Sequence, residues 1–458
     1  MLDLAVLRAE PARVTAALVR RNVPAEAVDA ALDLDQRWCA RQEVQEALRT
    51  RRRRISDEVA RRKTAGGPDE NAASETPPDL IRAGRGAARD LKAVQRAMRD
   101  LAARREAALL ALPNLPGTDV PDTPPDLDPS GPCWPHPFPP LAHWDLLAML
   151  RLVESAAGAG SGFLLWRGAG ARLVRGLVRF MLDVHTGEGG RKEVLAPPLA
   201  SRLALTGSAH LQTLEGKMYR VVDPGRDRSL TLAASEGAEA TESDLFLAPR
   251  AEPHLATLHA DTVLEADRLP VRLVAAATAL RRVPHGGGTE ERGLLRLGAF
   301  PTVEVYTFCQ PTESDAELER ALAGAEMILE GLGVAHRRRV RAATELSHAA
   351  ARTVSLDLWC PGLPAEEQNT DERGRWVEVA ALSSFTDYQA RRTGTQFRDA
   401  DGRARLVHTV GGAAVAVPRL LAAILETGQQ ADGAVRLPAA LEPYTGEAVL
   451  GAGNGTAR

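Results

Sequence analysis

The sequence has few cysteines and no long apolar run. Its 458 residues include four scattered cysteines, Cys39, Cys133, Cys309 and Cys360, and no two of them form a C-x-x-C pair. This argues against a zinc site and a disulfide scaffold and fits a reducing compartment, so we expect a cytoplasmic protein. No run of about 18 apolar residues suggests a membrane span. The opening residues MLDLAVLRAEPARV carry charges throughout and do not resemble a signal peptide.

A phosphate-cradling loop of the Gly-x-x-x-x-Gly-Lys-Ser/Thr type is also missing. The most glycine-rich candidate is RRVPHGGGTEERGLLRLGAFPTVEV, residues 281–305, and no lysine follows its glycines. In a loop of that type the lysine reaches the phosphates, so this reading fails. The arginines of the stretch therefore need another explanation.

Charge is distributed unevenly along the chain. Residues 1–110 hold 22 Lys and Arg against 17 Asp and Glu, a net charge of +5, whereas the whole chain carries −3, so the remainder carries −8. A basic N-terminal module on an acidic body favours a polyanion as partner of that module. A solvated helical surface would give the same charge pattern, and charge alone does not separate the two interpretations.

The N-terminal residues predict two long helices, over about 31–64 and 79–112, separated by the helix-breaking run TAGGPDENAAS. Apolar residues follow a seven-residue repeat in both, although Arg41, Gln45, Arg52 and Arg62 interrupt it in the first. Such a pair of helices is typical of an antiparallel coiled-coil hairpin. The repeat consists of Leu34, Trp38, Leu48, Ile55 and Val59 in the first helix and Leu91, Val94, Met98, Leu101, Ala108 and Leu112 in the second.

The tip of this hairpin is strongly basic. A run of arginines on a helix is usually a solvated face, but here it lies on a projecting rod that could follow a nucleic-acid backbone. The candidate nucleic-acid-contacting residues are Arg49, Arg51, Arg52, Arg53, Arg54, Arg61, Arg62 and Lys63.

Beyond the hairpin the chain changes character. Residues 113–140 contain 11 of the 30 prolines, which excludes regular helix or sheet and marks a linker. Residues 173–186 then predict an amphipathic helix, and long helices are expected at about 314–333 and 418–427. Between them lie short Val- and Leu-rich runs, which predict an α+β domain on an antiparallel sheet. These runs are KEVLAPPL, DLFLAPR, VRLVAAATAL, GLLRLGAFPTVEVYTF, TVSLDLWC, RWVEVAAL and RLVHTVGGAAVAV.

This order of arm, linker and sheet resembles the seryl-tRNA synthetases, which are class II aminoacyl-tRNA synthetases. The resemblance covers nearly the whole chain. It implies a tRNA-binding arm over 1–112, a linker over 113–140 and a class II catalytic domain over 141–458. The matching segments, in the family's order, are LLALPNLPGTDVP, RFMLDVHT, EVLAPPL, RAEPHLATLHAD, LPVRLVAAATALRR, RGLLRLGAFPTVE, FTDYQARRTGTQFRD, LVHTVGG and LLAAILETGQ.

The resemblance explains the arginines of residues 281–305. They match the family's second signature motif, a strand–loop–strand hairpin that binds ATP. Arg281 matches the arginine on the α-phosphate, Arg296 an arginine on the far strand, and Phe300 the ring that stacks on adenine. Glu304 matches a carboxylate that faces the amino acid. Attack of a carboxylate on the α-phosphorus requires fixed positive charge, which arginine supplies.

Four further positions carry over from the family. Arg419, near the start of a helix, matches the arginine on the γ-phosphate. Glu378 matches a carboxylate that helps to hold Mg²⁺, and Glu252 matches the glutamate of the Thr-Ala-Glu substrate segment. Pro197 matches the proline of the first motif, which implies a homodimer.

The amino-acid pocket departs from the family pattern. Arg250 stands where the family has the threonine of Thr-Ala-Glu, and an arginine there would repel a substrate ammonium group. Ala413 stands where a serine lies close to the substrate side chain. The other departures are Val283 for Glu, Gly298 and Ala299 for His-Gln, Ala380 and Ala381 for two serines, and Gly411, Gly412, Ala413 and Ala414 for Asn-Gly-Ser-Gly.

The resemblance thus implies a ligase that activates serine or a related acid with ATP and Mg²⁺ as an adenylate and transfers it to a serine-type tRNA. Two alternatives stay open at this point. One is a paralogue that activates a different acid for a non-tRNA acceptor. The other is a non-catalytic tRNA-binding relative. The retained phosphate-binding residues favour an enzyme, whereas the altered pocket leaves the acid itself open.

Overall fold

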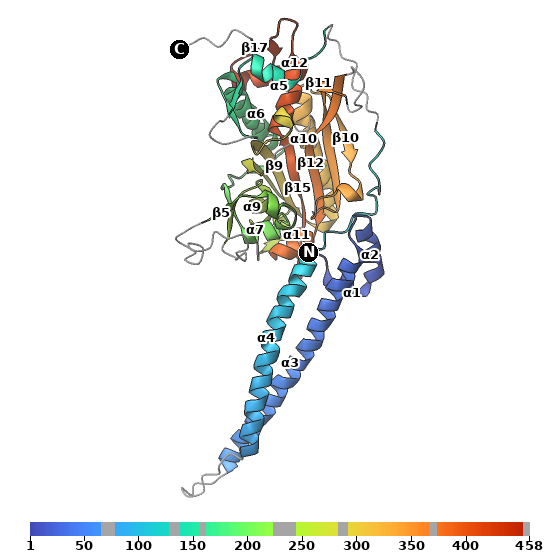
Figure 1. Cartoon of the computed structure of the whole chain (residues 1–458), viewed down its shortest axis with the longest axis vertical. Coiled ribbons are helices and arrows are strands. Elements are labelled where there is room, and N and C mark those ends of the chain that lie inside the picture. The colour runs from blue at the N-terminus through green and yellow to red at the C-terminus, as the bar shows by residue number, and fades with distance from the viewer. Residues whose placement is uncertain are drawn as a thin grey trace. The chain divides into compact units, whose positions relative to one another are not determined.

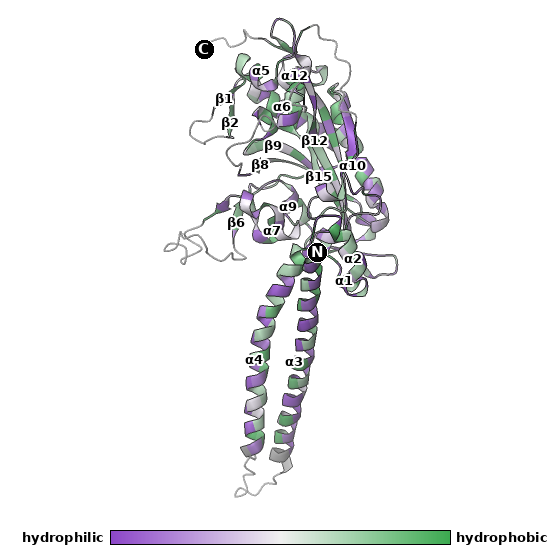
Figure 2. Ribbon diagram, turned by 45° about the vertical axis from the view of Figure 1, so that its right-hand side comes forward, coloured by the Kyte–Doolittle hydropathy of each residue, from purple (hydrophilic) through white to green (hydrophobic). Residues whose placement is uncertain are grey.

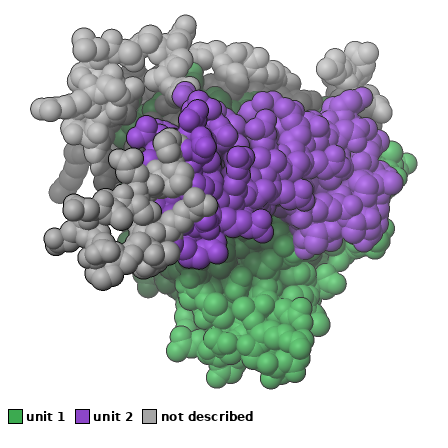
Figure 3. Space-filling view, turned by 90° about the horizontal axis from the view of Figure 1, so that it is seen from below, with its two compact units in different colours: residues 1, 114–458 green, residues 2–113 purple. Residues whose placement is uncertain are grey.

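The computed structural model describes residues 1–65, 78–127, 138–155, 162–222, 244–282, 292–365 and 373–451, with side chains omitted at 62–65, 78 and 155. The chain divides into two compact units, residues 2–113 and residues 1 and 114–458, which Figure 3 colours separately. None of the helices in the described ranges combines the length and apolar character that crossing a bilayer requires.

The N-terminal unit is the helical arm that the heptad repeat predicts (Figure 1). Its two long helices, α3 (Ala25–Ala65) and α4 (Pro78–Ala111), run antiparallel and follow the short helices α1 (Leu4–Ala9) and α2 (Pro11–Val19). Leu91 and Val94 of α4 are buried. Hydrophilic and hydrophobic residues alternate along both helices (Figure 2).

A buried carboxylate joins three helices of the arm. Asp35 of α3 is only 2 % exposed, and it accepts hydrogen bonds from Arg8 Nε at 2.7 Å and Arg105 Nε at 2.7 Å. The guanidinium of Arg105 also stacks over the Trp38 ring. Hydrogen bonds from Arg8, and secondarily from Arg105, hold the pKa of Asp35 below its usual value despite burial.

The second unit is built on a seven-stranded sheet (Figure 1). Neighbouring strands are antiparallel except at one edge, where β3 and β8 pair in parallel. This confirms the predicted α+β class. In spatial order the strands are β10 (His336–Val340), β11 (Arg352–Pro364), β12 (Arg373–Thr386), β15 (His408–Ala416), β9 (Ala299–Cys309), β8 (Val271–Leu280) and β3 (Lys192–Glu193).

Three helices, α6 (Ala169–Thr186), α10 (Ser314–Gly331) and α12 (Val417–Gly428), pack on the sheet and share one apolar core with it. Side chains alternate between the two faces of a strand, and β9 shows the consequence. Val303 and Val305 enter the core beneath these helices, whereas Thr302 and Glu304 line a cleft on the other face. One strand therefore builds both the core and the cleft.

Smaller elements surround the cleft and the sheet edges. They include a three-stranded sheet of order β4-β6-β5 and a second of order β14-β13-β7. Their bounds are α5 (His143–Met149), β1 (Val153–Ser155), β2 (Leu164–Trp166), β4 (Leu199–Ser201), α7 (Arg202–Gly207), α8 (Leu211–Leu214), β5 (Arg220–Val221), β6 (Leu245–Leu247), α9 (Glu252–Ala256), β7 (Val263–Glu265), η4 (Gly293–Leu295), α11 (Tyr388–Thr393), β13 (Gln396–Arg398), β14 (Ala404–Leu406), β16 (Val435–Arg436), α13 (Glu442–Thr445) and β17 (Val449–Leu450).

Two expected strands differ in the structure. The run KEVLAPPL is divided between β3 (Lys192–Glu193), with one further hydrogen bond from the Val194 amide to the Val274 carbonyl, and β4, which begins at Leu199. Pro197 and Pro198 lie between the two strands and have no amide hydrogen to donate. The strand expected from residue 293 begins at Ala299, after the 3₁₀ turn η4. The described residues of the proline-rich segment, 113–127 and 138–140, contain no helix or strand.

The Asp35 cluster makes a prediction for the stability of the arm. Asp35→Asn removes the charge from a buried acceptor of two guanidinium groups and should cost about 1.5–3 kcal/mol of local stability. Because the folded pKa is lowered, this stabilisation is present above the unfolded pKa of about 4 and is lost as the pH falls through the folded value. Native-state hydrogen exchange of α3 and α4 amides measures it.

Asp33→Asn is the matched control. Asp33 also pairs with an arginine, Arg37, on the same helix, but both side chains of that pair are exposed. It should cost less than about 1 kcal/mol. Equal effects of the two substitutions would contradict a special role of Asp35.

Candidate functional site

The cleft lies on the face of the central sheet that carries Thr302 and Glu304. It has a volume of about 530 Å³ and is lined by residues of β8, β9, β12, β15, η4 and α12 and of the segments next to them. It brings together eight of the residues singled out from the sequence, namely Arg250, Arg281, Arg296, Phe300, Glu304, Glu378, Ala413 and Arg419.

Buried positive charge is the main feature of this cleft. Arg281 follows the last residue of β8, and its Nε is buried with no hydrogen-bond partner in the part of the chain that the structure describes. Burial, and next the nearby charge of Arg250, lowers the pKa of Arg281 to about 10. Burial also lowers the pKa of Arg419. A cleft that confines cations in this way provides a favourable environment for a polyanion.

Arg419 is held in place by main-chain acceptors. It lies in the first turn of α12, and its Nη1 donates to the Glu378 carbonyl at 2.6 Å while its Nε donates to the Leu295 carbonyl at 3.3 Å. Leu295 belongs to the turn that precedes Arg296. These bonds hold β12, the turn η4 and helix α12 together around the guanidinium group.

A second cavity of about 300 Å³ adjoins the first and shares Arg250, Arg281 and Glu378 with it. Glu252 lines this second cavity and is 3 % exposed, and Glu304 lies close by at 1 %. The two carboxylates are linked, because the Glu252 amide donates to Glu304 Oε2 at 2.8 Å. Burial raises the pKa of both, and Arg250 opposes the rise.

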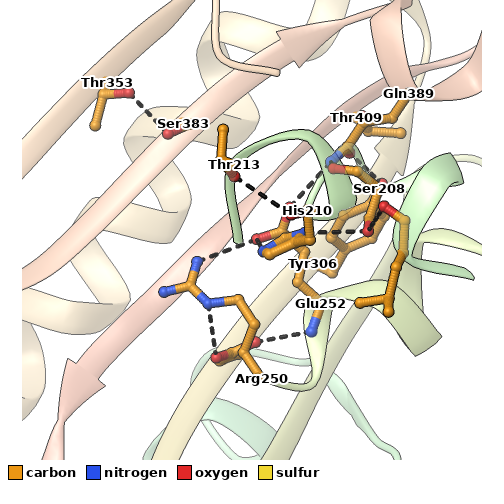
Figure 4. A network of polar contacts seen from close by, with 12 residues as sticks. Ser208, His210, Thr213, Arg250, Glu252, Tyr306, Thr353, Ser383, Gln389 and Thr409 are labelled. Carbon is orange, nitrogen blue, oxygen red and sulfur yellow. Dashed lines mark hydrogen bonds and ion pairs between the residues drawn. The ribbon is translucent and has the colours of Figure 1, made fainter. Parts of the chain in front are cut away.

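Arg250 approaches both carboxylates. Figure 4 labels Arg250 and Glu252 within this network. Its Nη1 lies 3.4 Å from Glu252 Oε2, and its Nε lies 3.4 Å from Glu304 Oε1. The sequence placed an arginine at this position but gave no sign that it pairs with the two glutamates. That pairing arises because the loop before α9 and the strand β9 meet in space.

Gln389 of α11 orients Glu252 and was not found from the sequence. Its Nε2 donates to Glu252 Oε1 at 2.9 Å, and its Oε1 accepts from Tyr306 Oη at 2.7 Å and Thr409 Oγ1 at 3.0 Å (Figure 4). This network leaves Glu252 Oε2 directed at Arg250 and, at 3.9 Å, at His210 Nε2. Burial lowers the pKa of His210 well below its usual value, so the ring is neutral.

A buried histidine supports the floor of the cleft. His143 Nδ1 donates to Glu426 Oε1 at 2.7 Å, and its Nε2 accepts from the Leu294 amide at 3.1 Å. The second oxygen of Glu426 accepts from the Gly362 amide at 2.8 Å. Both side chains have no exposed surface. The pair fixes Leu294 and Leu295, which line the cleft.

Known proteins match the chain over most of its length. Residues 1–116 match the model of the seryl-tRNA synthetase N-terminal domain, and residues 236–428 match the tRNA synthetase class II core domain (G, H, P, S and T). The serine–tRNA ligase of Gemmatimonas aurantiaca is 37 % identical over 413 residues, which are 88 % of each chain. That of Pelotomaculum thermopropionicum is 33 % identical, covering 97 % of this chain and 99 % of its own. The chain belongs to the seryl-tRNA synthetase family.

The fold agrees with this membership. The crystal structure of seryl-tRNA synthetase from Pyrococcus horikoshii complexed with ATP has a TM-score of 0.80 and 27 % identity. The match covers 98 % of this chain and 99 % of that one. The predicted class II fold with an N-terminal helical arm is therefore confirmed.

Glu378, the residue that the family resemblance assigns to Mg²⁺, is already paired. Its Oε2 contacts Arg341 and, at 3.4 Å, Arg339. Ala380 and Ala381 next to it offer no side-chain oxygen, and the described residues contain no cluster of three or more potential metal ligands. Nucleotide-bound Mg²⁺ is held mainly by phosphates, waters and one or two carboxylates. Glu378 fits that need as a single ligand if it exchanges Arg341 for the ion.

Two glycines of β15, Gly411 and Gly412, are required for steric reasons. Gly412 has φ +145°, and a Cβ there would lie 2.1 Å from the Ala381 carbonyl oxygen. A Cβ on Gly411 would meet the Val305 carbonyl at 2.7 Å. These residues let β15 approach β12 and β9 closely beside the second cavity. Val283, another departure from the family, lies outside the described residues.

The basic residues of the arm belong to the other compact unit. Arg51, Arg52, Arg53 and Arg54 are exposed on α3. Arg49 pairs with Glu46 and Arg61 with Glu58 on the same helix. The side chains of Arg62 and Lys63 lie outside the described residues.

The His143–Glu426 pair predicts a large effect on stability. His143→Ala leaves the Leu294 amide without its acceptor and removes one partner of a fully buried carboxylate, so it should cost about 2–5 kcal/mol in urea-induced unfolding. His336→Ala is the control, because that ring is half-buried on β10 and should cost less than about 1 kcal/mol. A small effect at His143 would show that the pair does not support the cleft floor.

Proposed function

We propose that this chain activates serine, or a closely related acid, with ATP and transfers the acyl group to the 3′ end of a serine-type tRNA. In the first step a carboxylate oxygen of the acid attacks the α-phosphorus, and pyrophosphate leaves. In the second step a hydroxyl group of the tRNA attacks the acyl carbon, and AMP leaves. The expected cytoplasmic location belongs to this proposal.

The observation that carries the proposal is the convergence of Arg281, Arg296 and Arg419 on one cleft. Arg281 and Arg296 flank one strand–loop–strand segment, whereas Arg419 lies more than 100 residues further along the chain. Phosphoryl transfer depends on positioning and on fixed positive charge around the phosphate group. Guanidinium groups suit that task because they remain charged and bind phosphate oxygens in a bidentate manner.

Phe300 and the cleft volume fit a nucleotide. Phe300 of β9 lines the cleft beside the arginines, and an aromatic ring that stacks on a base adds about 1–3 kcal/mol. The related Pyrococcus horikoshii enzyme was solved with ATP. We propose that Phe300 contacts adenine, Arg281 the α-phosphate and Arg419 the γ-phosphate.

Magnesium would act with the nucleotide. When bound, Mg²⁺ neutralises charge on the phosphate oxygens. Glu378 is the residue of this chain that we propose as its ligand, and Arg339 and Arg341 hold that carboxylate at the cleft wall until then. Glu252, Glu304 and the wall residue Ala413 would face the acid.

The arm and the family relationship extend the proposal to macromolecular partners. The exposed arginines of α3 fit the phosphate backbone of tRNA. The resemblance of the first motif, with Pro197, supports a homodimer. A paralogue with a non-tRNA acceptor and a non-catalytic relative gain no support, since the relatives reported above are named serine–tRNA ligases.

The nucleotide site is tested by Arg281→Ala. Removal of one preorganised phosphate-binding group should lower kcat/KM for serine-dependent ATP–pyrophosphate exchange by about 10²–10³-fold. Arg338→Ala is the control, because Arg338 pairs with Glu319 and Glu326 away from the cleft, and it should leave the exchange unchanged. Wild-type exchange rates in Arg281→Ala would show that the site is misplaced.

The arm is tested by a combined variant in which Arg49, Arg51, Arg52, Arg53 and Arg54 become glutamine. Each lost phosphate contact should reduce the slope of log affinity against log salt by about 1 and weaken tRNA binding at every salt concentration. Filter binding of tRNA over a salt series measures both quantities. ATP–pyrophosphate exchange, which does not involve tRNA, should stay at the wild-type rate, and an unaltered salt slope would assign these arginines a structural role.

A further inference from the structure

The acid subsite contains a cation of the protein's own. Glu252 and Glu304 are almost fully buried, and Arg250 lies 3.4 Å from an oxygen of each. Two neighbouring carboxylates in a site with little water are unfavourable unless a positive charge lies between them. Arg250 supplies this charge from within the chain.

Apart from Arg250, each carboxylate uses only one of its two oxygens in a hydrogen bond given by the structure. Glu304 Oε2 accepts from the Glu252 amide, and Glu252 Oε1 accepts from Gln389. The oxygens left over, Glu304 Oε1 and Glu252 Oε2, are the two that Arg250 approaches.

Arg250 satisfies these two oxygens poorly. Its Nε and Glu304 Oε1 are both buried, yet neither has a hydrogen-bond partner among the described residues. Its bond to Glu252 is long for a charged pair, which normally lies near 2.7–2.9 Å. The guanidinium group therefore balances the charge without the best geometry. A compact ammonium group, with three donors, would suit the same oxygens.

The surroundings disfavour a second cation beside Arg250. Arg281 and Arg341 line the same cavity. The carboxylate of Glu378, which also lines it, already pairs with Arg339 and Arg341. Arg250 also lines the larger cleft, and its side chain is 25 % exposed, so it has open space into which it can turn. An incoming ammonium group must displace it.

We propose that Arg250 is a specificity-determining residue whose guanidinium group competes with the α-ammonium group of the acid for Glu252 and Glu304. The inference rests on the proposed function, because it concerns the acid subsite of that reaction. It follows that the wild-type chain binds serine weakly and discriminates poorly between serine and glycerate, the acid of the same shape with a hydroxyl in place of the amino group.

The test is Arg250→Thr, assayed by ATP–pyrophosphate exchange with L-serine and with glycerate. Removing the competitor should lower the KM for serine by about tenfold or more with a much smaller change in kcat, and should raise the preference for serine over glycerate by a similar factor. Arg250→Lys keeps a cation near the two glutamates and should resemble the wild type.

Arg202→Thr is the matched control, because Arg202 is also ion-paired, with Glu215 and Asp244, but lines neither cavity. It should leave the KM for serine unchanged. Where the threonine variant is unstable, Arg250→Gln removes the charge and keeps hydrogen-bond donors. A folded, neutral variant with an unchanged or higher KM for serine would overturn the inference.

Serine-induced thermal stabilisation separates the inference from the proposed function. Absence of exchange in every variant would reject the proposed function. The shift in Tm caused by serine would still decide the role of Arg250. A larger shift in Arg250→Thr than in the wild type supports competition, and an equal or smaller shift rejects it.

Discussion

The structure of the catalytic unit depends on keeping several guanidinium groups close together in a partly dry cleft. Like charges at short range repel, and burial adds a desolvation cost, as the lowered pKa values of Arg281 and Arg419 show. The fold offsets part of this cost with main-chain carbonyl groups on Arg419 and with nearby carboxylates. A bound polyanion would offset the rest, which fits the proposed role of the cleft in binding phosphate.

The same strands that carry the charged groups also form the core. On β9, Val303 and Val305 pack under the helices while Thr302 and Glu304 face the cleft. Close approach of β15 to its neighbours requires Gly411 and Gly412. Side chains of the cleft thus stand on a rigid support, and a change in strand register would move every one of them to the wrong face.

The sequence predicted the elements with strong local patterns. The run VRLVAAATAL coincides with β8, and the expected helix at 418–427 lies within α12, because apolar periodicity determines both. The resemblance placed Arg281, Arg296 and Arg419 where they meet. Gln389, His210 and the His143–Glu426 pair were missed. Their roles come from contacts between residues far apart in the sequence, and no spacing rule records such contacts.

Charge balance in the acid subsite shows how one substitution can alter selectivity without altering the fold. Glu252, Glu304 and Glu378 each have an arginine of the same chain as partner. Any other cation, whether an ammonium group or a divalent metal ion, must therefore replace one of these arginines. The carboxylates then face a similar amount of positive charge before and after the replacement. The outcome then depends on differences in desolvation and hydrogen-bond geometry. Arg250, at 3.4 Å and without good geometry toward Glu304, is a weaker competitor than a closely bonded arginine would be, so the subsite stays open to a better-fitting donor.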